Sequence, residues 1–270
     1  MSELIAFVGG GQMAGSLIGG LLAAGHPAAR LLVAEPDGAR AELLRREHRV
    51  EVRARGVDVV AGADALVLAV KPQVMHEALA GVAPGASTTV VSIAAGVRIE
   101  TLRRWLGPDA PIVRCMPNTP ALLRAGVTAL HAPAATPAGP RALAEKILAA
   151  VGTTCWLEQE SQLDAVTALS GSGPAYFFLV AEALREAGTA LGLDAKTARL
   201  LAEKTLAGAG RMAEQSGKDV AELRANVTSK GGTTEAAVAH LESHGLRQLF
   251  AGAVRAAERR SRELGDALAK

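Results

Sequence analysis

The sequence predicts an α/β domain built on a doubly wound parallel sheet, followed by an all-helical domain. Two observations carry this prediction. Short apolar runs alternate with helical patterns along the first part of the chain, and no convincing strand run follows after about residue 158. Alternating strands and helices are typical of a parallel sheet that helices cover on both faces. We therefore expect one domain over residues 1–158 and a second over residues 159–270.

The predicted strands are continuous apolar runs, several of them rich in Val and Ile. Such runs are typical of parallel strands that are buried on both faces. The predicted strands are Leu4–Val8, Leu31–Ala34, Ala65–Val70, Thr89–Ile93, Ile112–Cys115, Val127–Leu130 and Thr154–Leu157. The helices predicted between them are Gln12–Ala24, Pro36–His48, Gln73–Leu79, Ile99–Leu106 and Pro140–Val151.

Helical patterns account for the second domain. The predicted helices are Ser161–Ala168, Pro174–Leu191, Ala195–Ser216, Val220–Asn226, Glu235–Ser243 and Gly245–Ala269. Along the second of these, apolar and small residues recur on one helical face at Phe177, Ala181, Leu184, Gly188 and Leu191. Helices of this kind expose too much apolar surface for a small isolated unit. We therefore expect a homodimer that buries them.

Composition excludes several classes of protein. The 270 residues are 49% hydrophobic and 21% charged, which excludes a disordered chain. A net charge of +2 and an aromatic content of 3% argue against a nucleic-acid or membrane partner. Residues 4–29 lack charged side chains, but their glycines and their change from strand to helix period indicate the buried start of a soluble domain.

Cysteine usage points to a reducing compartment. Cys115 and Cys155 are far apart in sequence, and neither has the spacing of a metal ligand set. We expect two buried thiols, no metal site and a cytoplasmic location.

A glycine fingerprint follows the first predicted strand. Residues 9–14 read Gly-Gly-Gly-Gln-Met-Ala, which fits the G-x-G-x-x-A pattern at a strand-to-helix junction. Gly9 permits a tight turn, Gly11 lets the backbone approach a pyrophosphate, and the small Ala14 lets the helix pack on the strand. The helix N-terminus offers free N–H groups and a partial positive charge to an anion. This pattern predicts a Rossmann-type dinucleotide site.

The end of the next strand bears on the choice of cofactor. An acid at this position, here Glu35, usually binds the ribose hydroxyls of NAD and repels the 2′-phosphate of NADP. Arg40, Arg45 and Arg46 follow it and could bind that phosphate, or could simply coat a solvated helix. The local chemistry favours NAD and leaves NADP open.

Further candidate residues follow the later strands. Ligands of open parallel sheets bind outside the carboxyl ends of the strands. Lys71 lies at such an end and could reach a cofactor phosphate or ribose. The small residues of Ser92–Gly96 leave room for a nicotinamide ring, and Asn118 offers both a donor and an acceptor. On the alternative interpretation these are surface or turn residues.

Two loops of the helical domain also carry candidate groups. Leu169–Tyr176 holds small polar residues followed by a proline suited to a first helical turn. Val227–Glu235 is a glycine-rich turn that enters a predicted helix, and its N–H groups and hydroxyls could bind a carboxylate. Taken singly, either loop could be an ordinary helix cap.

Together these motifs resemble those of pyrroline-5-carboxylate reductases, in the same order and over about residues 4–265. The shared motifs are Gly-Gly-Gly-Gln-Met-Ala, Ala-Val-Lys-Pro, Ser-Ile-Ala-Ala-Gly, Met-Pro-Asn-Thr-Pro, Leu-Ser-Gly-Ser-Gly-Pro-Ala-Tyr and Gly-Gly-Thr-Thr. The first occurs in many dehydrogenases, and the last three are specific to the family. The resemblance implies NADPH- or NADH-dependent reduction of 1-pyrroline-5-carboxylate to L-proline, the last step of proline biosynthesis. It also implies a Rossmann domain, a helical substrate-binding and dimerisation domain, and often a ring of dimers such as a decamer.

The resemblance also implies residue roles. The cofactor pyrophosphate would lie against Gly9, Gly11, Gln12 and Met13. Ala69, Lys71 and Pro72 would line the adenosine and phosphate side, with Ala95 and Asn118 near the nicotinamide. The substrate carboxylate would be bound by Ser229, Gly231, Gly232, Thr233 and Thr234. Thr234 would be the catalytic hydroxyl near the ring nitrogen. Two residues depart from the expected pattern: Lys230 replaces a proline, and Glu35 replaces a residue that tolerates the phosphate of NADP.

The implied chemistry suits these residues. A protonated imine is already electrophilic, so its reduction needs positioning and a proton relay rather than a metal or a strong base. A 3-hydroxy-acid dehydrogenase or a broader imine reductase is the alternative enzyme. Alcohol oxidation commonly uses a lysine base, and residues 161–195 contain no lysine. An NAD(P)-binding sensor without turnover and an S-adenosylmethionine methyltransferase explain the second-domain loops and helices less well.

Overall fold

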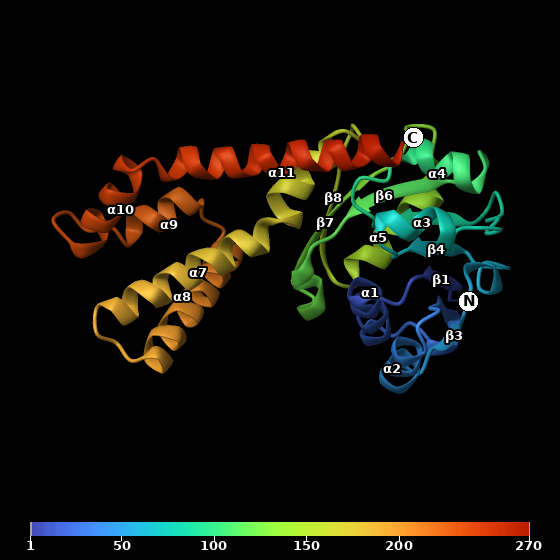
Figure 1. The fold of residues 1–270 in the computed structure, drawn as a ribbon, viewed down its shortest axis with the longest axis horizontal. Helices are drawn as coiled ribbons and strands as arrows, with labels where there is room; N and C mark the ends of the chain where they lie inside the picture. The colour runs from blue at the N-terminus through green and yellow to red at the C-terminus, as the bar shows by residue number, and fades with distance from the viewer. Residues whose placement is uncertain (1, 270) are drawn as a thin grey trace. The chain divides into compact units, whose positions relative to one another are not determined.

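The computed structural model describes residues 2–269 and divides into two compact units (Figure 1). The first unit holds the residues up to Ser172 together with those from Ala256 onward, and the second covers Gly173–Arg255. The end of the strand-like runs at about residue 158 therefore lies inside the first unit. The division into domains 1–158 and 159–270 stays a prediction.

The first unit is built on an eight-stranded sheet in the order β3-β2-β1-β4-β5-β6-β7-β8. The strands are β1 Ile5–Val8, β2 Leu31–Ala34, β3 Glu51–Arg53, β4 Ala65–Leu68, β5 Thr89–Ser92, β6 Ile112–Met116, β7 Gly126–His131 and β8 Gly152–Trp156. Strands β1 to β6 pair in parallel, which confirms the predicted fold class. β3 was not among the predicted strands, because three residues with one buried side chain give little apolar signal.

One detail of the sheet differs from the all-parallel expectation. β7 runs antiparallel to β6, and β8 is parallel to β7. The connection between β6 and β7 holds only the short 3₁₀ helix η3, Thr119–Leu123. A parallel return needs a crossover of a dozen or more residues, so this connection reverses the chain instead.

The helices of the first unit agree closely with the predicted ranges. They are α1 Gln12–Ala23, α2 Gly38–His48, α3 Pro72–Ala78, α4 Ile99–Leu106, α5 Ala138–Ala149 and α6 Gln162–Val166. The short 3₁₀ helices are η1 Ala28–Arg30 and η2 Gly56–Asp58, besides η3. A π-helix, η4, covers Thr167–Gly171 directly after α6.

Helices lie on both faces of the sheet (Figure 1), and a cluster of buried apolar side chains fills the space on each face. Ile5 and Phe7 of β1 pack into a core cluster with α1, α2 and α5, whereas Ala6 and Val8 pack into a second cluster with α3 and α4. Successive residues of a strand point to opposite faces, so a strand covered on both sides must be apolar at every position. This arrangement explains the continuous apolar runs of the sequence.

The last turns of α11, Leu246–Leu268, complete the first unit. Ser261 Oγ donates a hydrogen bond of 2.6 Å to Asp164 Oδ1, and both side chains are buried. A Cβ added to Gly265 would lie 3.1 Å from the Gly96 carbonyl oxygen. This end of α11 therefore packs closely against the loop that follows β5.

The second unit consists of helices. They are α7 Gly173–Ala190, α8 Ala195–Gln215, α9 Val220–Asn226, α10 Thr233–Ser243 and the first part of α11. Asp194 caps the N-terminus of α8, and its Oδ1 accepts the Lys196 and Thr197 N–H groups at 3.0 Å. Hydrogen bonds from the side chain and the backbone N–H of Thr197 hold the pKa of the Asp194 carboxyl below its usual range. None of the described helices is long and apolar enough to cross a bilayer.

The two cysteines differ in environment. Cys115 on β6 is buried, and burial raises the pKa of its thiol. Cys155 on β8 is exposed, so the expectation of two buried thiols was wrong for this residue. β8 forms the edge of the sheet, and its residues alternate between half-buried and exposed.

Candidate active site

The glycine turn between β1 and α1 has the shape that a dinucleotide site needs. Gly9 has φ +99°, and a Cβ added there would lie 2.9 Å from the Ala69 carbonyl. Only glycine fits this position without strain. Gly11 caps α1, and a Cβ added there would meet no atom within 4 Å. The backbone of Gly11 is therefore open to an approaching ligand, which fits the pyrophosphate role of the fingerprint.

A cavity of about 860 Å³ lies at the carboxyl ends of β1, β2 and β4. It brings together five of the predicted cofactor residues, namely Gly9, Gly11, Glu35, Ala69 and Lys71. The other predicted residues of this region lie around it. Gln12 lines a separate groove beside α1, Met13 packs partly buried against the core, and Pro72 is the first residue of α3.

Glu35 is held by the backbone on both of its carboxylate oxygens. Oε2 accepts the Gly10 N–H at 2.9 Å, and Oε1 accepts the Asp37 N–H at 3.0 Å. The side chain is buried, and Arg40 Nη1 lies 3.7 Å from Oε2. The carboxylate thus fixes the glycine turn and the start of α2, in addition to facing the cavity.

The basic residues near Glu35 occupy different environments. Arg40 lines the cavity, whereas Arg45 donates to the Val52 carbonyl at 3.0 Å and Arg46 is exposed on α2 outside the cavity lining. A further cation, Arg55, also lines the cavity. No sequence pattern pointed to Arg55, because it follows β3, a strand of three residues with little apolar signal.

The predicted nicotinamide residues lie on two loops of the first unit. Ala95 is half-buried between β5 and α4. Asn118 is buried, and its side-chain oxygen accepts the Val127 N–H at 3.0 Å while its nitrogen donates to the Ser170 carbonyl at 3.2 Å. Asn118 therefore connects the Met116–Pro120 loop to the π-helix η4. A π-helical turn of this kind often marks a functional site.

The predicted substrate loop lies in the second unit, before α10. Gly231 has φ +73°, and its N–H donates to Glu235 Oε2 at 2.7 Å. The Gly232 N–H donates to the Ser229 carbonyl at 3.0 Å. Gly232 caps α10 without a side-chain hydrogen bond, so the first N–H groups of α10 are available to an anion.

Within this loop, Thr234 is half-buried, whereas Ser229, Lys230 and Thr233 are exposed. Lys230, which replaces the expected proline, does not prevent the turn, because Gly231 supplies the positive φ. Glu235 was not among the predicted site residues. Its position, three residues after the cap of α10, is the acidic position of a capping box and was a usable signal.

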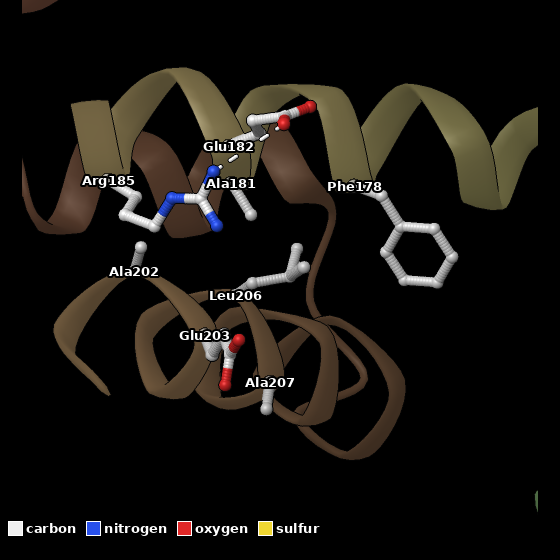
Figure 2. A pocket seen from close by; sticks show the side chains of 8 residues that line it. All are labelled: Phe178, Ala181, Glu182, Arg185, Ala202, Glu203, Leu206 and Ala207. Atoms are coloured by element: carbon white, nitrogen blue, oxygen red, sulfur yellow. Dashed lines mark hydrogen bonds and ion pairs between the residues drawn. The ribbon is translucent and has the colours of Figure 1, made fainter. Parts of the chain in front are cut away.

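No group of His, Cys, Asp and Glu side chains suited to a metal ion occurs among residues 2–269. A groove of about 510 Å³ lies between α7 and α8 in the second unit. Figure 2 shows Phe178 of α7 and Leu206 of α8 pointing into it, with Arg185 paired to Glu182 at 3.5 Å. The groove contains none of the predicted site residues.

The chain is similar to known proteins along almost its whole length. A family model described as pyrroline-5-carboxylate reductase dimerisation matches residues 160–264, and one described as NADP oxidoreductase, coenzyme F420-dependent, matches residues 4–96. The chain is 47% identical to a pyrroline-5-carboxylate reductase of Pseudomonas aeruginosa, over 98% of this chain and 97% of the relative.

Solved structures of that name superpose on the chain along almost its full length. A pyrroline-5-carboxylate reductase from Coxiella burnetii is 41% identical, with a TM-score of 0.90 over 98% of this chain and 99% of the other. A pyrroline carboxylate reductase of Plasmodium falciparum, with NADP bound, is 28% identical, with a TM-score of 0.85 over 97% and 98% of the two chains.

Proposed function

The chain belongs to the pyrroline-5-carboxylate reductase family, and we propose the residues with which it performs the reaction of that family. It reduces 1-pyrroline-5-carboxylate to L-proline with NADPH or NADH. The observation that carries this function is the match to reductases of that name over almost the whole chain, which covers both units. The reduction consumes one hydride and one proton for each imine.

We assign the cofactor to the cavity beside the glycine turn. Gly11 would receive the pyrophosphate, assisted by the N-terminus of α1, and Lys71 would offer a cation to phosphate or ribose. The other cofactor residues in this assignment are Gly9, Gln12, Met13, Glu35, Ala69, Pro72, Ala95 and Asn118. When bound, the reduced nicotinamide supplies the hydride that the imine carbon accepts.

We assign the substrate carboxylate to the loop that precedes α10. Its members are Ser229, Gly231, Gly232, Thr233 and Thr234. The N-terminus of α10 favours a negative charge, and no side chain occupies its cap. The half-buried Thr234 hydroxyl would pass a proton from water to the ring nitrogen as the imine carbon gains the hydride. This pairing leaves a neutral ring amine and needs no metal ion.

We also propose a cytoplasmic homodimer in which the α7 and α8 surfaces are covered by a second copy. The matched dimerisation family model spans both helices. α7 carries Phe177, Phe178 and Leu179, each with more than 60% of its surface exposed. Phe178 also lines the groove of Figure 2, together with Leu206 and with charged residues of both helices. We propose further that such dimers assemble into a ring, for example a decamer.

Loss of reduced-nicotinamide absorbance on adding 1-pyrroline-5-carboxylate, with proline measured as product, tests the function. The assay runs in parallel with NADPH and NADH. Oxidation of either cofactor with equal formation of proline supports the proposal. A folded protein that binds cofactor and forms no proline with either would contradict it. The molar mass in solution, measured by light scattering, tests the dimer and the ring of dimers.

A further inference from the structure

The loop between β5 and α4, residues 93–98, follows a strand that lies next to the cofactor cavity. The cavity occupies the ends of β1, β2 and β4, and β5 pairs with β4 on the side away from β1. A doubly wound sheet binds the two halves of a dinucleotide across the ends of its two groups of strands. With the adenosine half in the cavity, the nicotinamide half falls to the ends of β5 and β6, where this loop carries Ala95.

Two glycines bring the loop directly against the last turns of α11. Gly96 has φ +78°, and a Cβ added there would lie 3.3 Å from the Gly265 backbone nitrogen. A Cβ added to Gly265 would lie 3.1 Å from the Gly96 carbonyl oxygen and 3.4 Å from Arg98 Nη2. Both glycines are buried. The loop and the helix thus touch backbone to backbone, and a methyl group on Gly265 would force the Gly96 carbonyl away by a few tenths of an ångström.

Hydrogen bonds hold the end of the loop beside this contact. Arg98 donates from Nη2 to Asp266 Oδ1 at 2.5 Å. The next residue, Ile99, is the first of α4, and its N–H donates to Glu160 Oε1 at 2.9 Å. The same oxygen accepts a hydrogen bond from the buried Arg114 of β6 at 3.0 Å. The loop is therefore tied to α11 on one side and, through Glu160, to β6 on the other.

The last turns of α11 are themselves anchored to the first unit. The buried Ser261 hydroxyl donates to Asp164, and Leu268 packs against the apolar cluster beneath α3 and α4. Arg104 of α4 donates to the Ala269 carbonyl at 2.5 Å, and Figure 1 shows this end of α11 beside α4. Because the helix is held at several points, a change at its contact with the loop should displace the loop rather than the helix.

We propose that Gly265 and Asp266 of α11 are positioning residues that set the place of the nicotinamide ring through the β5–α4 loop. This inference rests on the proposed function, since it concerns hydride transfer at that site. Both residues act through the loop that carries Ala95 and are not among the residues assigned to cofactor or substrate. Hydride transfer depends steeply on geometry, and a displacement of about 1 Å can cost about 10²-fold in rate.

The variant Gly265→Ala tests the proposal by binding, without turnover. Alanine favours a helix, so the protein should fold. We expect calorimetry to show that NADPH binds about fivefold more weakly, whereas 2′-phospho-ADP-ribose, which lacks only the nicotinamide, binds within about twofold of the unmodified protein. The same comparison is made with NADH and ADP-ribose. A loss confined to the cofactors that carry the ring locates the effect at the nicotinamide.

Turnover supplies a second readout. The kcat of Gly265→Ala should fall about tenfold, while KM for the imine changes by less than about twofold, because the loop displaces the ring and not the substrate. Slower hydride transfer should also raise the isotope effect on kcat measured with cofactor deuterated at C4, which a general loss of stability would leave unchanged. Asp266→Ala should act in the same direction but more weakly, because its ion pair is exposed. Asp266→Asn keeps an acceptor for Arg98 and should restore most of the rate.

Gly139→Ala and Glu263→Ala are the matched controls. A Cβ added to Gly139 of α5 would meet nothing within 4 Å, and Glu263 of α11 pairs with Arg260 of the same helix. Both variants should leave cofactor binding, kcat and the isotope effect unchanged.

Equal weakening of NADPH and of the nicotinamide-free probe by Gly265→Ala would overturn the proposal, and so would unchanged cofactor binding and kcat. If Gly265→Ala does not fold, the two Asp266 variants, which change an exposed side chain, decide the question by the same measurements. Failure of the proposed function would appear separately, as absence of proline formation by the unmodified protein.

Discussion

The carboxylate of Glu35 accepts the backbone N–H of Gly10 at 2.9 Å, in a buried position at the centre of the glycine turn. Gly10 has no side chain, and a Cβ there would lie 2.5 Å from Leu44 Cδ1 and 3.2 Å from Glu35 Oε2. The Glu35 carboxylate thus holds the glycine turn by this hydrogen bond, and the space beside Gly10 admits no side chain. Glu35, the acid at the end of β2, therefore also supports the glycine turn to which we assign the cofactor pyrophosphate.

Replacement of Glu35 tests this relationship. Glu35→Ala leaves the buried Gly10 N–H without its partner, which should lower the free energy of unfolding by about 1–3 kcal/mol. The same change should weaken NADPH and NADH binding by similar factors, because it disturbs the turn that both cofactors share. Thermal unfolding and fluorescence titration with each cofactor measure these effects. Unchanged stability together with a large change in the NADPH to NADH affinity ratio would show that the carboxylate acts on the ribose alone.

Gly9 and Gly11 should respond differently to the same substitution. Gly9→Ala places a Cβ 2.6 Å from Val70 Cγ1 at a φ of +99°, and such strain should lower the free energy of unfolding by about 1–3 kcal/mol. Gly11→Ala meets open space, so it should change stability by less than about 1 kcal/mol. It should still weaken cofactor binding at least tenfold, because the added methyl would face the pyrophosphate that we assign to this turn. Two variants with equal losses of stability would contradict this division of roles.

Thr234 is expected to act in turnover rather than in cofactor binding. Thr234→Ala removes the hydroxyl assigned to the ring nitrogen and should lower kcat about 10²-fold, the lower end of general acid catalysis. Thr234→Ser keeps a hydroxyl and should retain most of the activity. Steady-state kinetics and cofactor titration of both variants provide the measurement. An alanine variant with full kcat would exclude the proton-relay role.

Glu235 is expected to act as a positioning residue for the substrate loop. Its carboxylate accepts the Gly231 N–H at 2.7 Å and so holds the turn that leads into α10. Glu235→Ala should raise KM for the imine several-fold with a smaller effect on kcat, because the carboxylate contacts the loop and not the reacting atoms. Glu235→Gln keeps an acceptor oxygen and should restore most of the affinity. If the glutamine variant were as impaired as alanine, the role would belong to the charge of Glu235.

The reactivity of the two thiols tests the burial of Cys115 and the exposure of Cys155. Cys115 is buried with a raised thiol pKa and should resist modification at neutral pH, because the thiolate is the reactive form. Cys155 is exposed on the edge strand and should react. Titration with a coloured thiol reagent should count one thiol in the native protein and two after unfolding. A native count of two would mean that the sheet around Cys115 opens readily.

Strands buried on both faces could be predicted from the sequence, because a local apolar pattern determines them. Continuous apolar runs located the strands flanking Gly9, Lys71 and Asn118, since burial on both faces demands such runs. The pattern failed at β3, whose three residues form an edge strand with one buried side chain. Arg55 was missed for the same reason, because a residue at a strand end is recognised only once the strand is known.

The features that could not be predicted from the sequence depend on contacts between distant segments. The reversal of β7 depends on the short connection after β6 rather than on the residues of β7 itself. The bonds from Asn118 to Val127 and Ser170 join segments that are distant in sequence. The hydrogen bonds from the Gly10 and Asp37 N–H groups to Glu35 could not be predicted from the sequence. They depend on the folded shape of the glycine turn, and an acid at a strand end has the same sequence pattern with or without them.

Transfer of deuterium from the cofactor to the product tests the central claim most directly. The protein is incubated with 1-pyrroline-5-carboxylate and NADPH deuterated on the transferred position of C4, and the proline formed is analysed by mass spectrometry and NMR. Direct hydride transfer predicts one deuterium per proline, located on C5, with NADP⁺ formed in equal amount. Proline without deuterium, or oxidation of the cofactor without proline, would contradict the assignment of this chain as the reductase.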